Sequence, residues 1–119
     1  MNKILSLFDE NYVRELFTEK VLPLYPKFSG IEKIEIKPYK KMVWNTTYHV
    51  VISYDVYFTR PDRNSKKMLI VCSAHSEEPR DNVLKALEFL WKHNFNQEHI
   101  NIPRPLFYSE YFRGTFYRG

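Results

Sequence analysis

The feature that most constrains this fold is a long alternation of apolar and more polar residues at positions 46–59. Side chains of a strand point to opposite faces in turn, so the alternation predicts a strand with one buried face. Because a strand of this length usually lies inside its sheet, we expect a neighbouring strand on each edge. The positions expected on the buried face are Val50, Ile52, Tyr54, Val56 and Phe58.

Two flanking segments supply the expected neighbours. Residues 34–37 alternate apolar and charged side chains, which predicts a half-buried strand that Pro38 is expected to stop. On the other side, a turn cluster at residues 61–65 precedes a continuous apolar run at residues 68–72. Such a run is typical of a strand covered on both faces, so we expect a helix to pack on it.

Two segments carry helical periodicity. Residues 9–25 repeat apolar side chains at helical spacing, with Asp9 as the expected N-cap and prolines ending the pattern. Residues 79–93 carry an apolar stripe behind Pro79, which suits the first turn of a helix. We expect this second helix to be the one that covers the sheet.

The chain closes on two short aromatic segments near residues 106–109 and 112–118, which can pair as a hairpin about Glu110 and Tyr111. The whole pattern predicts an α+β fold, in which an antiparallel sheet of about five strands carries one packed helix and an N-terminal helix. Neither an internal repeat nor a change of composition divides the chain, so residues 1–119 are expected to form a single domain.

Composition excludes several classes of protein. The chain is 44% hydrophobic with only 3 Gly, which is typical of a globular domain rather than a disordered one. The net charge of +4 comes from 18 basic residues scattered among 14 acidic ones, so it points only weakly to nucleic acid. A single cysteine allows no intrachain disulfide. No signal peptide and no membrane helix of roughly 20 apolar residues is recognised, and a cytoplasmic protein without a membrane partner is expected.

Three patterns follow one another in the last third of the chain. Residues 82–90 form a leucine-rich run with an acidic residue, residues 102–106 have an apolar-Pro-x-Pro-apolar pattern, and residues 114–119 form an aromatic segment. Their order, after three strands, resembles the small N-terminal lobe of the aminoglycoside-phosphotransferase-like and protein-kinase-like folds. The resemblance covers residues 34–119.

The resemblance implies a nucleotide site on the sheet. In that family a glycine-rich loop between the first two strands lets backbone N–H groups approach the phosphates of ATP. The matching connection here, residues 39–45, contains no glycine. Lys40 and Lys41 are its candidates for contacting phosphate, although paired lysines are also typical of a solvated turn.

Further site residues carry over one by one from the family pattern. Cys72 stands near the position of the third-strand lysine that holds phosphate oxygens, and Glu88 stands where the following helix carries that lysine's partner. Tyr117 and Gly119 lie on the strand that runs to the hinge, where adenine would rest. A buried structural thiol and a solvated helix carboxylate are the plain alternatives for Cys72 and Glu88.

The resemblance places catalysis outside this chain, because the catalytic base and the magnesium ligands of the family lie in its large lobe. No catalytic or metal-ligating residue is assigned. Cys72 and His75 are expected on opposite faces of one strand, and His49 has no partner at ligand spacing. We expect an isolated or truncated small lobe with residual ATP binding, whose partner is the missing catalytic lobe and whose cofactors, ATP and Mg²⁺, require a full-length parent.

Two other functions fit these residues. A non-enzymatic protein-interaction or regulatory module would explain the missing phosphate loop, the missing strand lysine and the many tyrosines. A nucleic-acid-binding aromatic sheet is the less favoured reading. A lobe that packs on a partner, or a homo-oligomer, predicts an exposed aromatic surface, and the residues expected to form it are Phe107, Tyr111, Phe112 and Phe116.

Overall fold

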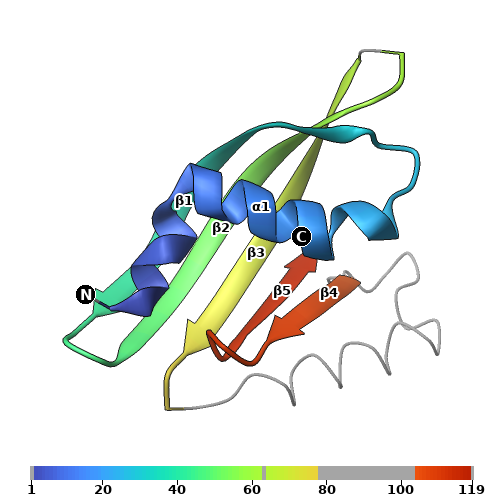
Figure 1. Cartoon of the computed structure of the whole chain (residues 1–119). Coiled ribbons are helices and arrows are strands. Elements are labelled where there is room, and N and C mark those ends of the chain that lie inside the picture. Colours follow the sequence, from blue (N-terminus) through green and yellow to red (C-terminus); the bar gives the residue numbers. More distant parts are fainter. Residues whose placement is uncertain (1, 63, 78–103, 119) are drawn as a thin grey trace, which may run out of the picture.

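The computed structural model of this chain describes residues 2–62, 64–77 and 104–118 (Figure 1). Its strands form one five-stranded antiparallel sheet in the order β1-β2-β3-β5-β4. The α+β class and the five-stranded antiparallel sheet expected from the sequence are therefore confirmed. The elements in chain order are η1 (Lys3–Phe8), α1 (Glu10–Lys20), η2 (Leu22–Leu24), β1 (Gly30–Val43), β2 (Tyr48–Thr59), β3 (Ser65–His75), β4 (Arg104–Ser109) and β5 (Gly114–Arg118).

The long alternating segment forms β2, which lies between β1 and β3 as its length predicts. The five apolar positions assigned to its inner face are all fully buried. We call the side of the sheet that they occupy the core face and the opposite side the outer face. Burial of one set of alternate side chains fixes the register, because a slip by one residue would expose the whole set.

β1 is longer than its sequence pattern predicts. The expectation that Pro38 stops the strand is wrong, since β1 continues through it to Val43 with a register shift between Pro38 and Lys40. Proline lacks an N–H donor and is tolerated where a strand has an unpaired edge or a bulge. β1 provides both, because it is an edge strand that pairs only with β2.

β3 follows the turn that residues 61–65 predict, but its apolar run is buried unevenly. Met68, Ile70 and Cys72 are buried on the core face, whereas Leu69 on the outer face keeps 39% of its surface exposed. The prediction that both faces of this strand are covered is therefore wrong at Leu69. The helix expected at residues 79–93 lies outside the described residues.

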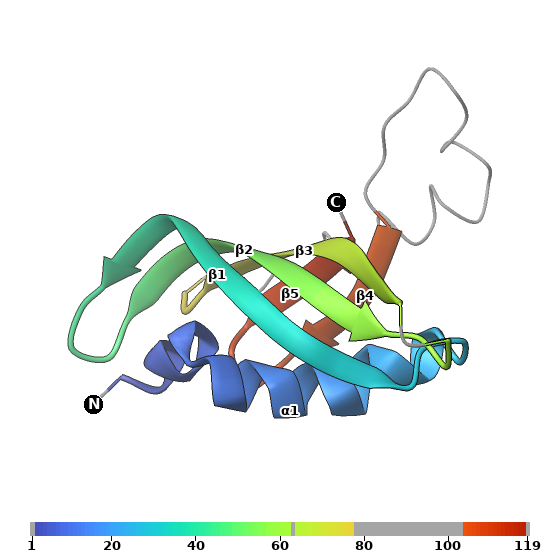
Figure 2. The same cartoon turned by 90° about the horizontal axis from the view of Figure 1, so that it is seen from above.

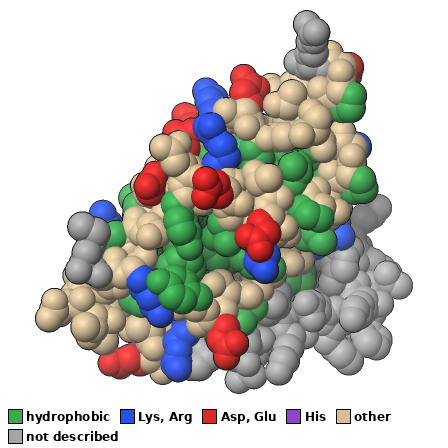
Figure 3. All heavy atoms as spheres, in the orientation of Figure 1, with side chains coloured by type: hydrophobic (Ala, Val, Ile, Leu, Met, Phe, Trp, Pro, Cys, Tyr) green, Lys and Arg blue, Asp and Glu red, His purple; other side chains and the backbone are tan. Residues whose placement is uncertain are grey.

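The N-terminal helix covers the core face (Figure 2). Asp9 caps α1 as predicted, since its carboxylate accepts a hydrogen bond from the backbone N–H of Asn11 at 3.0 Å. Phe17 projects from α1 into the sheet, where its ring meets Tyr54 edge-on at 5.2 Å and Phe116 at 5.8 Å between centroids. On the face that carries α1, basic and acidic side chains are interspersed rather than gathered by sign (Figure 3).

The closing hairpin is confirmed, with β4 and β5 joined by a four-residue turn at 110–113. The exposed aromatic surface predicted for it is wrong at two positions. Phe112 and Phe116 are buried, because both pack in the hydrophobic core together with residues of the N-terminal segment. Phe107 stacks on Phe116 at 4.4 Å and is half-buried, so Tyr111 is the one of the four that stays largely exposed.

Candidate functional site

Strand register arranges the outer face into rows of side chains that run across the sheet. Residues directly opposite one another in antiparallel strands point to the same face. Three consecutive rows approach the β1–β2 turn. They are Lys37, Ser53, Val71 and Tyr117; then Lys40, Val51, Ser73 and Thr115; then Met42, His49 and His75.

The two candidate phosphate lysines lie on opposite faces of the sheet. The structure places both within β1 rather than in a turn, so the expected connection at 39–45 is wrong, and the turn occupies residues 44–47. Lys41 points to the core side, where its Nζ lies 4.5 Å from the centroid of the Phe8 ring. Lys40 is exposed on the outer face opposite Val51. Only Lys40 can therefore serve a site on the outer face.

Cys72 is sealed inside the core. It lies opposite Ile52 on one side and Phe116 on the other, and its side chain is fully buried. Burial raises the pKa of the thiol far above its ordinary value, so the group stays protonated at neutral pH. Glu88 and Gly119, the other two candidates near it in the expected site, lie outside the described residues.

Tyr117 shares the outer face with Lys40. It lies on β5 opposite Val71 and is half-buried, and this burial raises the pKa of its hydroxyl. Three inter-strand spacings separate β5 from β1, so each row that reaches β5 spans about 14 Å across the sheet, and Tyr117 and Lys40 lie at opposite ends of neighbouring rows. The structure thus brings two of the candidate residues to one face and leaves Lys41 and Cys72 on the other.

A buried carboxylate links three strands on the outer face. Asp55 on β2 is 7% exposed, and its Oδ2 accepts a 2.6 Å hydrogen bond from Lys37 Nζ on β1. Lys67 Nζ on β3 lies 3.7 Å from the same oxygen. The hydrogen bond from Lys37 is the main cause that lowers the pKa of Asp55, and it likewise raises the pKa of Lys37. Glu35 lies opposite Asp55 on β1 and places a second carboxylate near Lys37.

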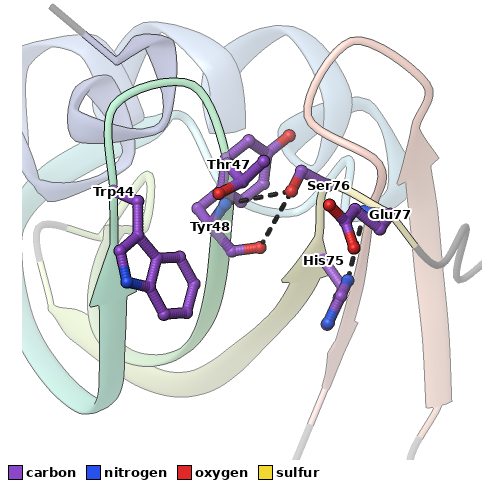
Figure 4. A pocket seen from close by; sticks show the side chains of 6 residues that line it. All are labelled: Trp44, Thr47, Tyr48, His75, Ser76 and Glu77. Carbon is purple, nitrogen blue, oxygen red and sulfur yellow. Dashed lines mark hydrogen bonds between the residues drawn. The ribbon is translucent and has the colours of Figure 1, made fainter.

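A shallow depression of about 420 Å³ opens where the β1–β2 turn meets the end of β3 (Figure 4). Ser76, which lines the depression, is held against Tyr48 by two hydrogen bonds. Its Oγ accepts a hydrogen bond from the Tyr48 N–H at 3.0 Å and donates one to the Tyr48 carbonyl at 3.2 Å. Beside it, the Glu77 N–H donates to His75 Nδ1 at 3.1 Å. The residues that line the depression are Trp44, Thr47, Tyr48, His75, Ser76 and Glu77.

The pairing of His49 with His75 was not predicted from the sequence. These residues lie 26 positions apart in the chain, yet β2 and β3 place them directly opposite each other with ring centroids 4.5 Å apart. Strand alternation alone assigns each of them to the face opposite the buried positions. Their juxtaposition follows only from the register between the two strands.

Within residues 2–62, 64–77 and 104–118, no three side chains of His, Cys, Asp or Glu gather as metal ligands. The same described residues include no helix long and apolar enough to cross a membrane. Comparison of this chain with family models, with curated proteins and with solved structures finds no match.

Proposed function

We propose that this chain is the small lobe of an ATP-dependent phosphotransferase, a lobe that contacts the nucleotide loosely and does not carry out phosphoryl transfer alone. The observation that carries the proposal is the pairing of β5 with β3, which puts Val71 opposite Tyr117 and Ser73 opposite Thr115 on the outer face. The family pattern puts phosphate-holding and adenine-holding residues on these two segments. Their direct pairing supports a common ligand spanning both strands.

The nucleotide would lie on the outer face. On the core face, Phe17 and its neighbouring rings fill the space over β5, and Cys72 is fully buried there. The outward-facing neighbour of Cys72 is Ser73, which is half-buried and lies between Val51 and Thr115. A serine hydroxyl can donate a hydrogen bond to a phosphate oxygen but supplies no charge. Because the position near the family's strand lysine is the buried Cys72 and its outward-facing neighbour is an uncharged serine, we propose weak binding.

We infer the orientation of the nucleotide from the residues at the β5 and β1 ends of the outer-face rows. Tyr117 offers an aromatic surface at the β5 side, where a base can pack. Lys40 offers an exposed ammonium at the β1 side, where it can contact phosphate as a point charge. Lys67 also faces outward on β3, but it lies close to the Asp55 carboxylate, which neutralises part of its charge.

Titration of the chain with ATP and Mg²⁺, followed by amide NMR, tests this proposal. We expect saturable shifts at Lys40, Ser73 and Tyr117, with smaller changes at Cys72. Lys40→Ala should weaken binding about fivefold, because one exposed charge contact is worth up to roughly 1 kcal/mol. Lys66→Ala is the matched control, since Lys66 is exposed at the start of β3 in a core-side position. Unchanged amides at millimolar ATP would refute nucleotide binding.

A protein-interaction module is the second candidate, because three large apolar side chains are exposed near the β1–β2 turn. They are Tyr39, Met42 and Trp44, with exposed fractions of 76%, 42% and 55%. Aromatic residues and methionine are enriched at protein interfaces. Sedimentation of the chain over a wide concentration range tests self-association at this turn. Association that Trp44→Ser abolishes would favour this candidate, and a monomer at every concentration would exclude self-association.

A further inference from the structure

One cross-strand row on the outer face brings together three side chains that can donate to a metal ion. Met42 lies opposite His49 on the neighbouring strand, and His49 lies opposite His75 on the next. Opposite residues of an antiparallel pair hold their Cβ atoms about 4.5–5.5 Å apart. Met42 is exposed and both histidines are half-buried, so a small ion can reach all three from solvent.

The two imidazoles are close enough to share one ion. Their ring centroids lie 4.5 Å apart, and their planes are tilted by 54°. Two nitrogens bound to one metal at about 2.0 Å, with a near-tetrahedral angle, lie about 3.3 Å from each other. Rings at this separation can present one nitrogen each at that distance through side-chain rotation alone. Met42 lies opposite His49, so its flexible thioether can approach the same ion from the β1 side.

The side-chain atoms that this row offers as ligands indicate which metal ion it would bind. Ca²⁺ and Mg²⁺ require oxygen ligands, and the row contains none. A zinc site normally takes at least three ligands from His, Cys, Asp and Glu, and no such group gathers in the described part of the chain. Soft thioether sulfur together with imidazole suits Cu(I). The thiol of Cys72 lies on the opposite face and is buried, so it cannot join this row.

We propose that Met42, His49 and His75 bind one Cu(I) ion with two nitrogen ligands and one sulfur ligand. Binding involves no change of oxidation state, because the ion enters as Cu(I) and both imidazoles stay neutral. The site shares no residue with the proposed nucleotide site, since it uses the row nearest the β1–β2 turn and none of Lys40, Ser73 and Tyr117.

Binding must break the hydrogen bond between the Glu77 amide and His75. The Nδ1 atom of His75 accepts from the backbone N–H of Glu77 at 3.1 Å. If Cu(I) takes Nδ1, the ion replaces this hydrogen bond. If Cu(I) takes Nε2, the proton of the neutral ring moves to Nδ1, which can then no longer accept. The Glu77 amide is therefore a reporter in either case (Figure 4).

The test is competition for Cu(I) against a chromophoric Cu(I) chelator at pH 7 with oxygen excluded. We expect one ion per chain. Met42→Leu should weaken binding by about tenfold or more, because even the loss of groups that only support metal ligands has effects of that size. His49→Asn and His75→Asn should abolish it. Two matched controls should bind as the parent chain does: Met68→Leu, which removes a thioether on the core face, and Cys72→Ala.

A second measurement uses the unaltered chain and so does not depend on whether a variant folds. One equivalent of Cu(I) should shift the Met42 methyl resonance and the Glu77 amide. Failure to compete with the chelator, or an unmoved Met42 methyl at saturation, would overturn the proposal. So would binding that Met42→Leu leaves intact or that Cys72→Ala removes.

Discussion

Replacing Phe17 with alanine tests how α1 closes the core face. Phe17 is fully buried, and its ring contacts three aromatic side chains edge-on: Tyr54, Phe107 and Phe116. Burying a phenylalanine stabilises a fold by about 1.5–3 kcal/mol through transfer from water. Aromatic pairs add about 0.5–1.5 kcal/mol each, though not additively. The cavity left behind brings typical Phe→Ala losses to about 3–5 kcal/mol, and we expect about 4 kcal/mol here.

Urea unfolding followed by circular dichroism measures this loss. With a denaturant slope of about 2 kcal/mol per molar, the unfolding midpoint should fall by about 2 M. Glu15→Ala is the control, because Glu15 is exposed on the same helix and should change stability by less than about 0.5 kcal/mol. A loss below about 1 kcal/mol for Phe17→Ala would refute the argument, since the ring would then not be enclosed as the structure has it.

The thiol of Cys72 gives the same experiment a second readout. It lies on β3 opposite Phe116, one of the rings that Phe17 contacts, and it is fully buried. In the parent chain it should react with a thiol reagent only when the core opens. Phe17→Ala should accelerate labelling, whereas Glu15→Ala should not. Fast labelling of the parent chain would show that α1 does not seal the core face.

Two further changes probe the outer and core faces. Asp55→Asn should reduce the free energy of unfolding most above pH 5. The hydrogen bond from Lys37 lowers the pKa of Asp55 in the folded state. The stabilisation from the ionised carboxylate is therefore fully present above the ordinary pKa near 3.8, and it is lost as the pH falls through the lower pKa of the folded state. A stability difference between parent and variant that is the same at pH 2 and pH 6 would contradict this. Tyr54→Phe should lose about 1–2 kcal/mol in urea unfolding, because the buried hydroxyl donates to the Leu7 carbonyl at 2.7 Å; no measurable loss would mean that the carbonyl finds another donor.

The parts of the fold that the sequence predicted are those set by local patterns. The alternation in β2, the Asp9 cap of α1 and the turn before β3 are all encoded in neighbouring residues. The errors arose where a neighbouring strand or a packed core changed the outcome. Pro38 breaks a strand in isolation, but an edge position with a bulge accommodates it.

For the candidate site, too, some features follow from local sequence patterns and others depend on tertiary packing. Strand alternation assigns the adjacent residues Lys40 and Lys41 to different faces, but both were expected in a turn, where strand alternation does not apply. The burial of Cys72 under aromatic rings, which keeps its thiol protonated, depends on α1 packing against the sheet. The apolar spacing of residues 9–25 predicts that this helix has a buried face, but it does not predict which strands that face covers.

The sequence by itself determined the class of fold, the interior position of β2 and which of its side chains are buried, because strand periodicity and burial are properties of neighbouring residues. Only the tertiary structure decided which distant residues meet. The pairing of β2 with β3 puts His49 beside His75, and the pairing of β3 with β5 puts Val71 beside Tyr117. Register between strands is chosen by burying the whole apolar face at once, so it emerges only when the sheet and α1 close on a common core.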